Sequence, residues 1–264
     1  MSLQQNILAC STNTYHNFNL EEALRGISSA GFRYVEIAAV SGWTQHITPD
    51  TSPELLKKLL AQNNLEFISI SAHSNFSQDE GKNYFMRCLS FAKQIGVNIV
   101  NTGLGESKNK EEIKRTYANI KTAANYAHEL NLTIAIETHG DIIPTGSKAR
   151  EVLKEISSPN VKINYDTGNV LFYGDVKPED DLPLIVDQVA HIHLKDKIGE
   201  YKEWNFPALG EGKVNFPAIF EILRKASYNG PLSLEIEFTP SSNKSLKQIN
   251  EATQKSFLYL KKIL

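Results

Sequence analysis

Strand-like apolar runs recur along this chain about every 30 residues, with helical segments between them. They are centred near Leu8, Val35, Ile68, Ile99, Ile134, Ile163, Ile192 and Leu234. This spacing is the length of one strand–helix unit, and strands that alternate with helices form parallel sheets. Eight such units predict an α/β fold, a single-domain (β/α)8 TIM barrel over residues 1–264.

The helical segments between these runs have their own start signals. Asn19 and Ser52 are each followed by residues typical of a first helical turn, so both are predicted to be N-caps. Longer amphipathic segments predict helices over residues 110–130, 215–227 and 245–263. No Pro/Gly/Ser-rich linker divides the chain, which agrees with one domain.

Charge and cysteine content argue against several classes of protein. The formal net charge is −2, whereas nucleic-acid-binding proteins usually carry a basic excess. The two cysteines, Cys10 and Cys88, are too few for a disulfide framework. No segment approaches the roughly 20 apolar residues of a membrane span, and the N-terminal residues do not resemble a signal peptide. We therefore expect a cytoplasmic enzyme without nucleic-acid or membrane partners.

Four of the strand-like runs end in a side chain of a type that binds metal ions. These side chains are Glu137, Asp166, His193 and Glu235. In a parallel β/α barrel the C-terminal ends of all strands meet at one mouth, so the four groups are predicted to converge there. Alternation along each strand also places all four on the face that enters the barrel.

Three carboxylates and one imidazole at one mouth form a mixed oxygen and nitrogen site. Carboxylates in a pocket of low dielectric repel each other unless a cation offsets their charge, and a divalent ion is the simplest cation. The carboxylate-rich set favours Mn²⁺ or Mg²⁺, while the imidazole leaves Co²⁺, Fe²⁺ and Zn²⁺ open. The sequence therefore predicts one divalent ion per chain, with Mn²⁺ as the first choice.

The same alternation directs other polar groups into the barrel mouth. Glu36, His73 and Lys195 occupy inward positions and are predicted to contact substrate. Two of them have simpler alternatives. A lone inward glutamate such as Glu36 is often an ion-pair partner, and Lys195 can neutralise Asp196 or a carboxylate at the mouth.

Two further inward residues also have structural alternatives. Glu237 is as compatible with ion pairing as with a role in the site. His191 lies one strand repeat deeper than His193, and it is predicted to be a hydrogen-bonded core histidine.

Residues 196–215 form a long gap before the last strand-like run and are predicted to be a loop at the mouth. The loop contains Trp204 and Phe206, and aromatic rings can stack on the C–H face of a sugar. We expect Trp204, with Phe206, to cover the site and contact bound substrate. Packing of these rings on the barrel rim is the alternative.

Six short segments together resemble those of the xylose isomerase-like TIM barrel superfamily of sugar isomerases and epimerases. They are residues 31–37, 134–137, 166–169, 191–196, 210–216 and 230–235. Each segment is weak alone, but all six occur in order and span essentially the whole chain. The resemblance implies metal binding by Glu137, Asp166, His193 and Glu235, the four residues already chosen by position.

In the epimerase branch of this superfamily, the resemblance implies proton transfer by Glu137 and Glu235. One glutamate removes the proton from the carbon next to a carbonyl, which gives an enediolate, and the other returns a proton to the opposite face. The predicted function is a metal-dependent isomerase or epimerase that acts on a small-molecule sugar or keto-sugar.

Two positions differ from the ketose epimerases. Asn169 stands where they have a histidine after the metal-binding aspartate, and Lys195, Lys197 and Lys202 stand near the place of an arginine. We expect Asn169 to contact substrate.

A dehydratase or lyase acting on a keto-sugar or keto-cyclitol, similar to inosose dehydratase, shares the metal and the first proton abstraction and is the alternative. A non-catalytic sugar-binding barrel is a third. The substrate, its phosphorylation and assembly into a homo-oligomer are left open.

Overall fold

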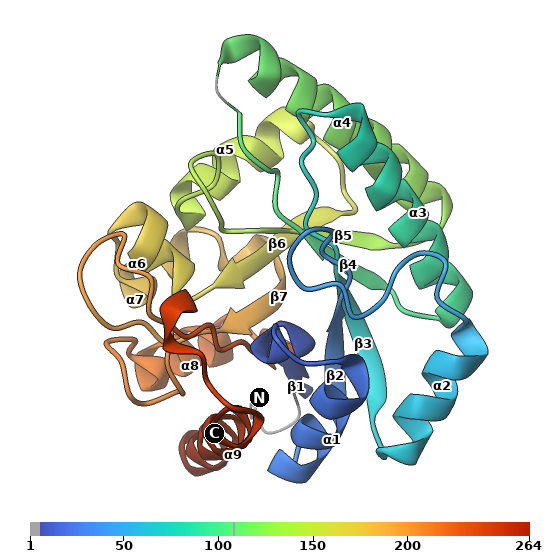
Figure 1. Ribbon diagram of the computed structural model, residues 1–264. Coiled ribbons are helices and arrows are strands. Elements are labelled where there is room, and N and C mark those ends of the chain that lie inside the picture. Colours follow the sequence, from blue (N-terminus) through green and yellow to red (C-terminus); the bar gives the residue numbers. More distant parts are fainter. Residues whose placement is uncertain (1–5, 108) are drawn as a thin grey trace.

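The computed structural model describes residues 6–107 and 109–264, with the backbone alone of Pro240. Within these residues, eight parallel strands close into a barrel in sequence order, and β8 pairs with β1. Helices surround the strands (Figure 1). The strands are β1 (Leu8–Ser11), β2 (Tyr34–Ala38), β3 (Glu66–Ser71), β4 (Ile99–Thr102), β5 (Thr133–Glu137), β6 (Val161–Asp166), β7 (Val189–Leu194) and β8 (Leu232–Leu234).

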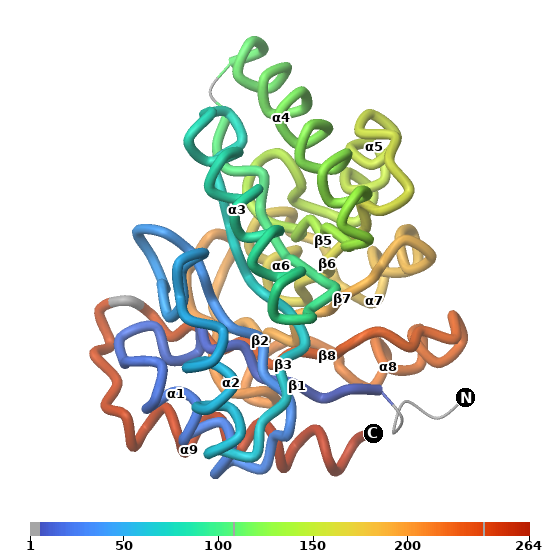
Figure 2. The backbone as a smooth tube through the Cα atoms, turned by 90° about the vertical axis from the view of Figure 1, so that its right-hand side faces the viewer, coloured from blue at the N-terminus to red at the C-terminus, as the bar shows by residue number. Residues whose placement is uncertain are grey.

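The helices follow the strands around the barrel, and Figure 2 shows them from the side. They are α1 (Leu20–Ala30), α2 (Pro53–Gln62), α3 (Asp79–Ile95), α4 (Lys110–Glu129), α5 (Gly146–Ile156), α6 (Asn169–Gly174), α7 (Pro178–Asp181), α8 (Phe216–Lys225) and α9 (Leu246–Ile263). Short 3-10 turns are η2 (Thr12–Tyr15), η3 (Leu182–Leu184), η4 (Val186–Gln188) and η5 (Pro240–Ser242).

The predicted barrel is confirmed, and all eight predicted strand centres lie in or beside an observed strand. Asn19 caps α1 in a capping box, and the side chain of Ser52 caps α2. The main differences lie between β6 and β7, where α6 and α7 are too short to show a helical period in the sequence. The domain prediction extends over residues 1–5 and 108, which lie outside the described residues.

The alternation predicted for the strands holds on β5. Ile134 and Ile136 belong to the buried apolar core, while the carboxylate of Glu137 is directed to the polar groups inside the barrel. Among the described residues, none of the helices combines the length and apolar character that crossing a membrane requires.

The loop over residues 196–215 is organised around one buried carboxylate. Asp196 accepts hydrogen bonds from the backbone N–H groups of Lys197, Gly210, Gly212 and Val214, at 2.8 to 3.1 Å. A Cβ atom on Gly212 would lie 2.2 Å from Asp196 Oδ1, so this approach requires glycine. Backbone groups therefore satisfy Asp196, which removes the expected alternative that Lys195 serves to neutralise it.

Candidate active site

The four strand-end groups predicted to converge do so at the C-terminal mouth. Ligand atoms of Glu137, Asp166, His193 and Glu235 all lie within 4.8 Å of one another, and the four side chains are buried. His193 Nδ1 lies 3.1 Å from Glu137 Oε2, 3.4 Å from Glu235 Oε2 and 3.7 Å from Asp166 Oδ2. One imidazole nitrogen therefore faces all three carboxylates.

Asp166 is held by the backbone that follows β6. Its Oδ1 accepts hydrogen bonds from the N–H groups of Gly168 and Asn169, both at 2.8 Å. Its Oδ2 is buried and makes no hydrogen bond within the described part of the chain, although Lys195 Nζ lies 3.2 Å away. A buried oxygen of this kind needs a further positive partner, because leaving it unmatched costs free energy.

Glu137 is held by donors on both of its oxygens. Asn169 Nδ2 donates to Oε1 at 2.8 Å, and Asn164 Nδ2 donates to Oε2 at 3.0 Å. His73 Nε2 lies 3.1 Å from Oε2. Burial would raise the pKa of Glu137, but the charges of His73 and His193 outweigh burial and lower the pKa well below its usual range. The carboxylate is therefore ionised and fixed in direction.

Glu235 lies across the mouth, in the segment after β8. Asn13 Nδ2 donates to its Oε1 at 3.0 Å, and Lys195 Nζ lies 2.7 Å from its Oε2. Lys195 also pairs with Glu237 at 2.6 Å, so the ion-pair alternative for Glu237 is found. Burial would lower the pKa of Lys195, but Asp166, Glu235 and Glu237 raise it well above its usual range. Lys195 thus brings a fixed positive charge to the mouth.

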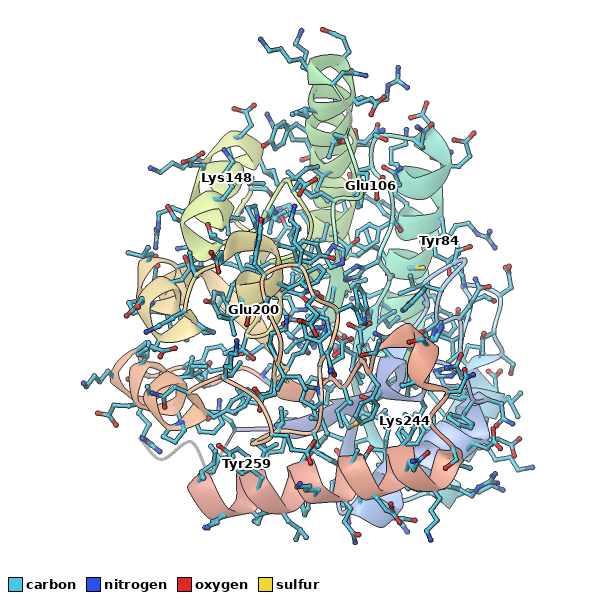
Figure 3. All side chains as sticks on the ribbon, turned by 60° about the vertical axis from the view of Figure 1, so that its left-hand side comes forward. Tyr84, Glu106, Lys148, Glu200, Lys244 and Tyr259 are labelled. Atoms are coloured by element: carbon cyan, nitrogen blue, oxygen red, sulfur yellow. The ribbon has the colours of Figure 1, made fainter. Side chains whose placement is uncertain are left out.

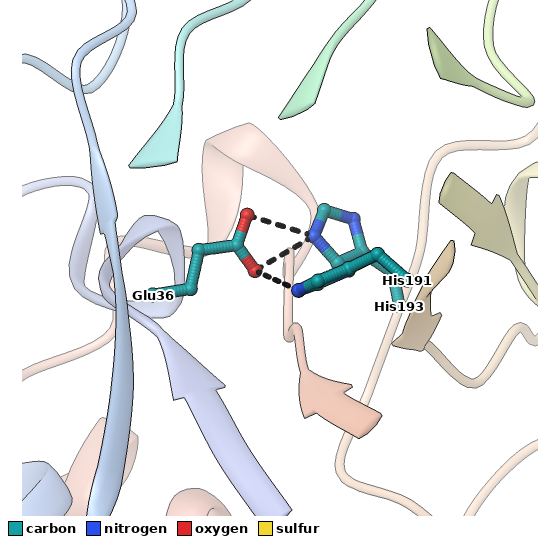
Figure 4. A group of neighbouring side chains, drawn as sticks. All are labelled: Glu36, His191 and His193. Carbon is teal, nitrogen blue, oxygen red and sulfur yellow. Dashed lines mark hydrogen bonds and ion pairs between the residues drawn. The ribbon is translucent and has the colours of Figure 1, made fainter. Parts of the chain in front are cut away.

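His193 is oriented by Glu36, which lies beside the rings of His191 and His193 (Figure 4). Glu36 Oε2 lies 2.9 Å from His193 Nε2, the nitrogen that points away from the three mouth carboxylates. Burial would raise the pKa of Glu36, but His193 and His191 lower it to about 2. An ionised carboxylate at Nε2 keeps a hydrogen on that nitrogen, so Nδ1 is the nitrogen that would give up its proton to bind an ion.

Glu36 therefore differs from the expected substrate contact. It is fully buried beneath His193, accepts a hydrogen bond from Asn101 Nδ2 at 2.8 Å and is not among the residues that line the cavity. Strand alternation predicted its inward direction but not its depth. The prediction for His191 is confirmed, because its ring is buried and hydrogen-bonds with Ser69 and Asn164.

The donor set fits one divalent ion. Carboxylate oxygens and imidazole nitrogens bind such ions at roughly 2.0–2.2 Å, so two ligands on opposite sides lie at most about 4.4 Å apart. The ligand atoms here lie within 4.8 Å of one another, so small side-chain movements suffice. The unmatched Oδ2 of Asp166 faces the same point. These acidic and histidine residues are thus positioned to bind a metal ion.

We expect Glu36→Gln to weaken Mn²⁺ binding by roughly 10–100-fold, the effect typical of a lost partner behind a metal-binding histidine. Glutamine keeps the shape, but Asn101 and His193 both need an acceptor from it, and its amide offers one oxygen. Calorimetric titration with Mn²⁺ measures the change. Glu66→Gln, the same change at an exposed residue of β3, is the matched control. Unchanged affinity in Glu36→Gln would show that Glu36 does not orient His193.

A cavity of about 300 Å³ opens above the four groups. Among the residues predicted to form the site, His73, Glu137, Lys195, Trp204 and Glu235 line it. The predicted substrate contact Asn169 does not line the cavity, and its amide instead holds Glu137.

The two aromatic residues of the 196–215 loop differ in position. Phe206 is buried, with Lys195 Nζ 4.8 Å from its ring centre, so the rim-packing alternative holds for this ring. Trp204 faces the cavity. Movement of the loop over bound substrate stays a prediction.

Several cavity residues were not predicted from the sequence. They are Asn13, Val40, Trp43, Ser71, His139 and Tyr173. A local signal existed for two of them: His139 follows Glu137 by two residues, and Tyr173 lies one helical turn after Asn169 on α6. Tyr173 Oη and His139 Nε2 lie 3.1 Å apart. Burial lowers the pKa of His139 to about 4, with help from the charge of His73, so this imidazole is neutral.

Known proteins share this architecture. The chain is 22% identical to an L-ribulose 3-epimerase from Methylomonas sp., with 81% of this chain and 77% of that protein covered. It is 26% identical to an inosose dehydratase from Mesomycoplasma hyopneumoniae strain J, with 94% and 90% covered. The structure superposes on D-psicose 3-epimerase from Clostridium cellulolyticum H10 with a TM-score of 0.77, at 16% identity, covering 97% and 99%. The family described as xylose isomerase-like TIM barrel matches residues 24–263, and the chain belongs to this family.

Proposed function

We propose that this protein is a divalent-metal-dependent isomerase or epimerase that moves a proton next to the carbonyl of a sugar or sugar derivative. The observation that supports it most is the pair Glu137 and Glu235. They come from β5 and the end of β8, line one cavity, and are both within 3.4 Å of His193 Nδ1. Two carboxylates in these positions can exchange protons with one bound molecule from two sides.

The roles of the residues follow from their contacts. A divalent ion bound by Glu137, Asp166, His193 and Glu235 would draw electrons from a substrate carbonyl and make the neighbouring C–H bond more acidic. One of the two glutamates takes the proton from that carbon, and the other returns a proton from the opposite side. Asn169 and Asn13 hold the two carboxylates in direction through hydrogen bonds of 2.8 and 3.0 Å.

The choice of Mn²⁺ as the resident ion is part of this proposal. Three of the four ligands are carboxylates, which suits a hard ion, while His193 makes Mn²⁺ a better match than Mg²⁺.

A dehydratase is the second candidate function. Two observations favour it: the relatives include inosose dehydratases, and His73, which can donate a proton, lines the cavity together with the positive charge of Lys195. Burial would lower the pKa of His73, but Glu137 raises it, which favours the protonated ring. In a dehydratase, the hydroxyl group that leaves needs a proton donor of this kind. An epimerase instead needs a second acid–base group on the opposite side of the substrate.

Solvent deuterium uptake tests the shared first step and then separates the two candidates. Ketoses, keto-cyclitols and 3-keto-glycosides are incubated in D₂O with the Mn²⁺-loaded protein and followed by NMR. We expect deuterium at the carbon next to the carbonyl, with exchange that stops on chelation and returns with Mn²⁺. An inverted centre identifies an epimerase, and loss of water identifies a dehydratase. Binding without exchange for every compound would favour a sugar-binding barrel instead.

A further inference from the structure

A second cavity, of about 180 Å³, adjoins the one above the candidate metal site. The two cavities share the residues Asn13, Trp43, Trp204 and Glu237 in their walls. A cavity of about 150 Å³ holds benzene, so the second cavity has room for the six-atom frame of one sugar ring, whose hydroxyl groups would lie against its polar wall residues. The proposed function uses only the first cavity, and the second needs its own explanation.

The junction between the cavities is aromatic. The ring of Trp43 stacks on His16 with centroids 4.1 Å apart, and meets the edge of Trp204 at 6.3 Å. Trp43 is 45% exposed, although large apolar rings are usually covered. An exposed indole ring that is held by neighbouring rings offers a flat apolar face. The C–H face of a sugar ring is also apolar, so the two faces can stack.

A hydrogen-bond chain links the junction to the proton-transfer residues. Asn13 Nδ2 donates to Glu235 and also to Glu237, at 3.0 and 2.9 Å. The hydroxyl of Thr44 donates to Asn13 Oδ1, so His16 Nδ1, 2.7 Å from that hydroxyl, must be the donor to it. Burial lowers the pKa of His16, so the ring is neutral and its Nε2 is an acceptor for a ligand hydroxyl.

The charges of the second cavity suit a neutral ligand. Among the described residues that line it, Lys244 is the only lysine or arginine, and its Nζ lies over the ring of Phe238 at 5.1 Å. Figure 3 labels Lys244 beside the N-terminal end of α9, where Ser245 and Gln248 form a capping box. Glu237 adds a carboxylate to the same wall. A phosphate site usually brings several cations together, whereas the described residues of this wall include one lysine, Lys244.

We propose that the second cavity binds a second sugar ring, so that the substrate is a two-ring glycoside whose keto-sugar ring occupies the first cavity. This inference rests on the proposed function and names its substrate class. Trp43 and Trp204 stack on the glycoside at the junction, and His16 and the amides of the second cavity bind hydroxyl groups of the outer ring.

Binding tests the site independently of any reaction. The Mn²⁺-loaded protein is titrated by calorimetry with methyl α-D-glucopyranoside, with the disaccharides trehalose, maltose, cellobiose and sucrose, and with glucose 1-phosphate. We expect at least one disaccharide to bind about ten-fold more tightly than the methyl glycoside, the ratio that one aromatic contact and one hydrogen bond supply. Equal affinities for all sugars, or tighter binding of the phosphate than of every disaccharide, would overturn the proposal.

A matched pair of variants tests whether the tighter binding of disaccharides depends on the second cavity. Ser242 is exposed and lines the second cavity, so Ser242→Trp should fill it and remove the disaccharide advantage. Ser241 is also exposed but does not line it, so Ser241→Trp should keep the advantage. Melting temperatures show whether both variants fold. A disaccharide advantage that survives in Ser242→Trp overturns the proposal.

Deuterium exchange of the 3-keto derivatives of the same sugars then separates this inference from the proposed function. Faster exchange in the two-ring ketones than in the one-ring ketone supports both the second-ring site and the proton-transfer function. Preferential disaccharide binding with no exchange in any ketone would refute the proton-transfer function and keep the second-ring site.

Discussion

Glu137→Gln and Glu235→Gln are each expected to lower the rate of proton transfer by on the order of 10²-fold or more. Glutamine keeps the length of the side chain and an oxygen for an ion, but it cannot accept a proton at neutral pH. Asn169 and Asn13 can still donate to that oxygen, whereas Asn164 beside Glu137 and Lys195 beside Glu235 each lose an acceptor. The loss should therefore appear in kcat, while metal content should fall less than in His193→Ala.

Deuterium exchange and product formation, measured separately on the true substrate, resolve the two roles. In an epimerase, the variant that lacks the returning acid should still exchange the proton without inverting the centre. In a dehydratase, the variant that lacks the abstracting base should lose exchange and product together. Glu129→Gln, an exposed position on α4, is the matched control. If both variants turn over at nearly the wild-type rate, the proton-transfer pair lies elsewhere, and Lys195 and His73 become the next candidates.

His193→Ala is expected to abolish stable metal binding and, with it, activity. His193 Nδ1 faces all three mouth carboxylates, and its Nε2 is held by buried Glu36. The loss should exceed the roughly 10–100-fold expected for Glu36→Gln, because a direct ligand is removed rather than its partner.

Elemental analysis of protein purified without chelator measures this effect. The wild-type protein should hold about one equivalent of a divalent ion, which is Mn²⁺, Mg²⁺, Co²⁺, Fe²⁺ or Zn²⁺. His193→Ala should hold almost none, while His128→Ala, at an exposed histidine of α4, should match the wild type. A full equivalent of metal in His193→Ala would place the ion at other residues.

The barrel and the four converging groups were predictable because both depend on repeated local patterns. The alternation of apolar residues defines each strand, and the rule that parallel strands end at one mouth brings Glu137, Asp166, His193 and Glu235 together without any knowledge of loops. The resemblance to known segments pointed to the same residues.

The remaining cavity residues depend on features that short patterns do not encode. Trp43 comes from the loop between β2 and α2, and Asn13 from the turn η2 after β1. Their positions follow from contacts with distant residues such as Trp204 and Glu235. Glu36 shows a second limit, because alternation predicts the side of a strand that a group occupies but not whether another side chain covers it.

The cluster of N–H groups around Asp196 has a consequence for how the substrate range of this barrel can change over generations. Its contacts come from both ends of the 196–215 loop, from Lys197 at one end and from Gly210, Gly212 and Val214 at the other. The ends are thereby tied together, and Phe206 is held between them by backbone pairing with Glu237, whereas residues 199–203 are exposed or half-buried. We expect insertions and replacements over residues 199–203 to be tolerated at small cost in stability, so this part of the mouth can change while the buried carboxylates beneath it stay in place.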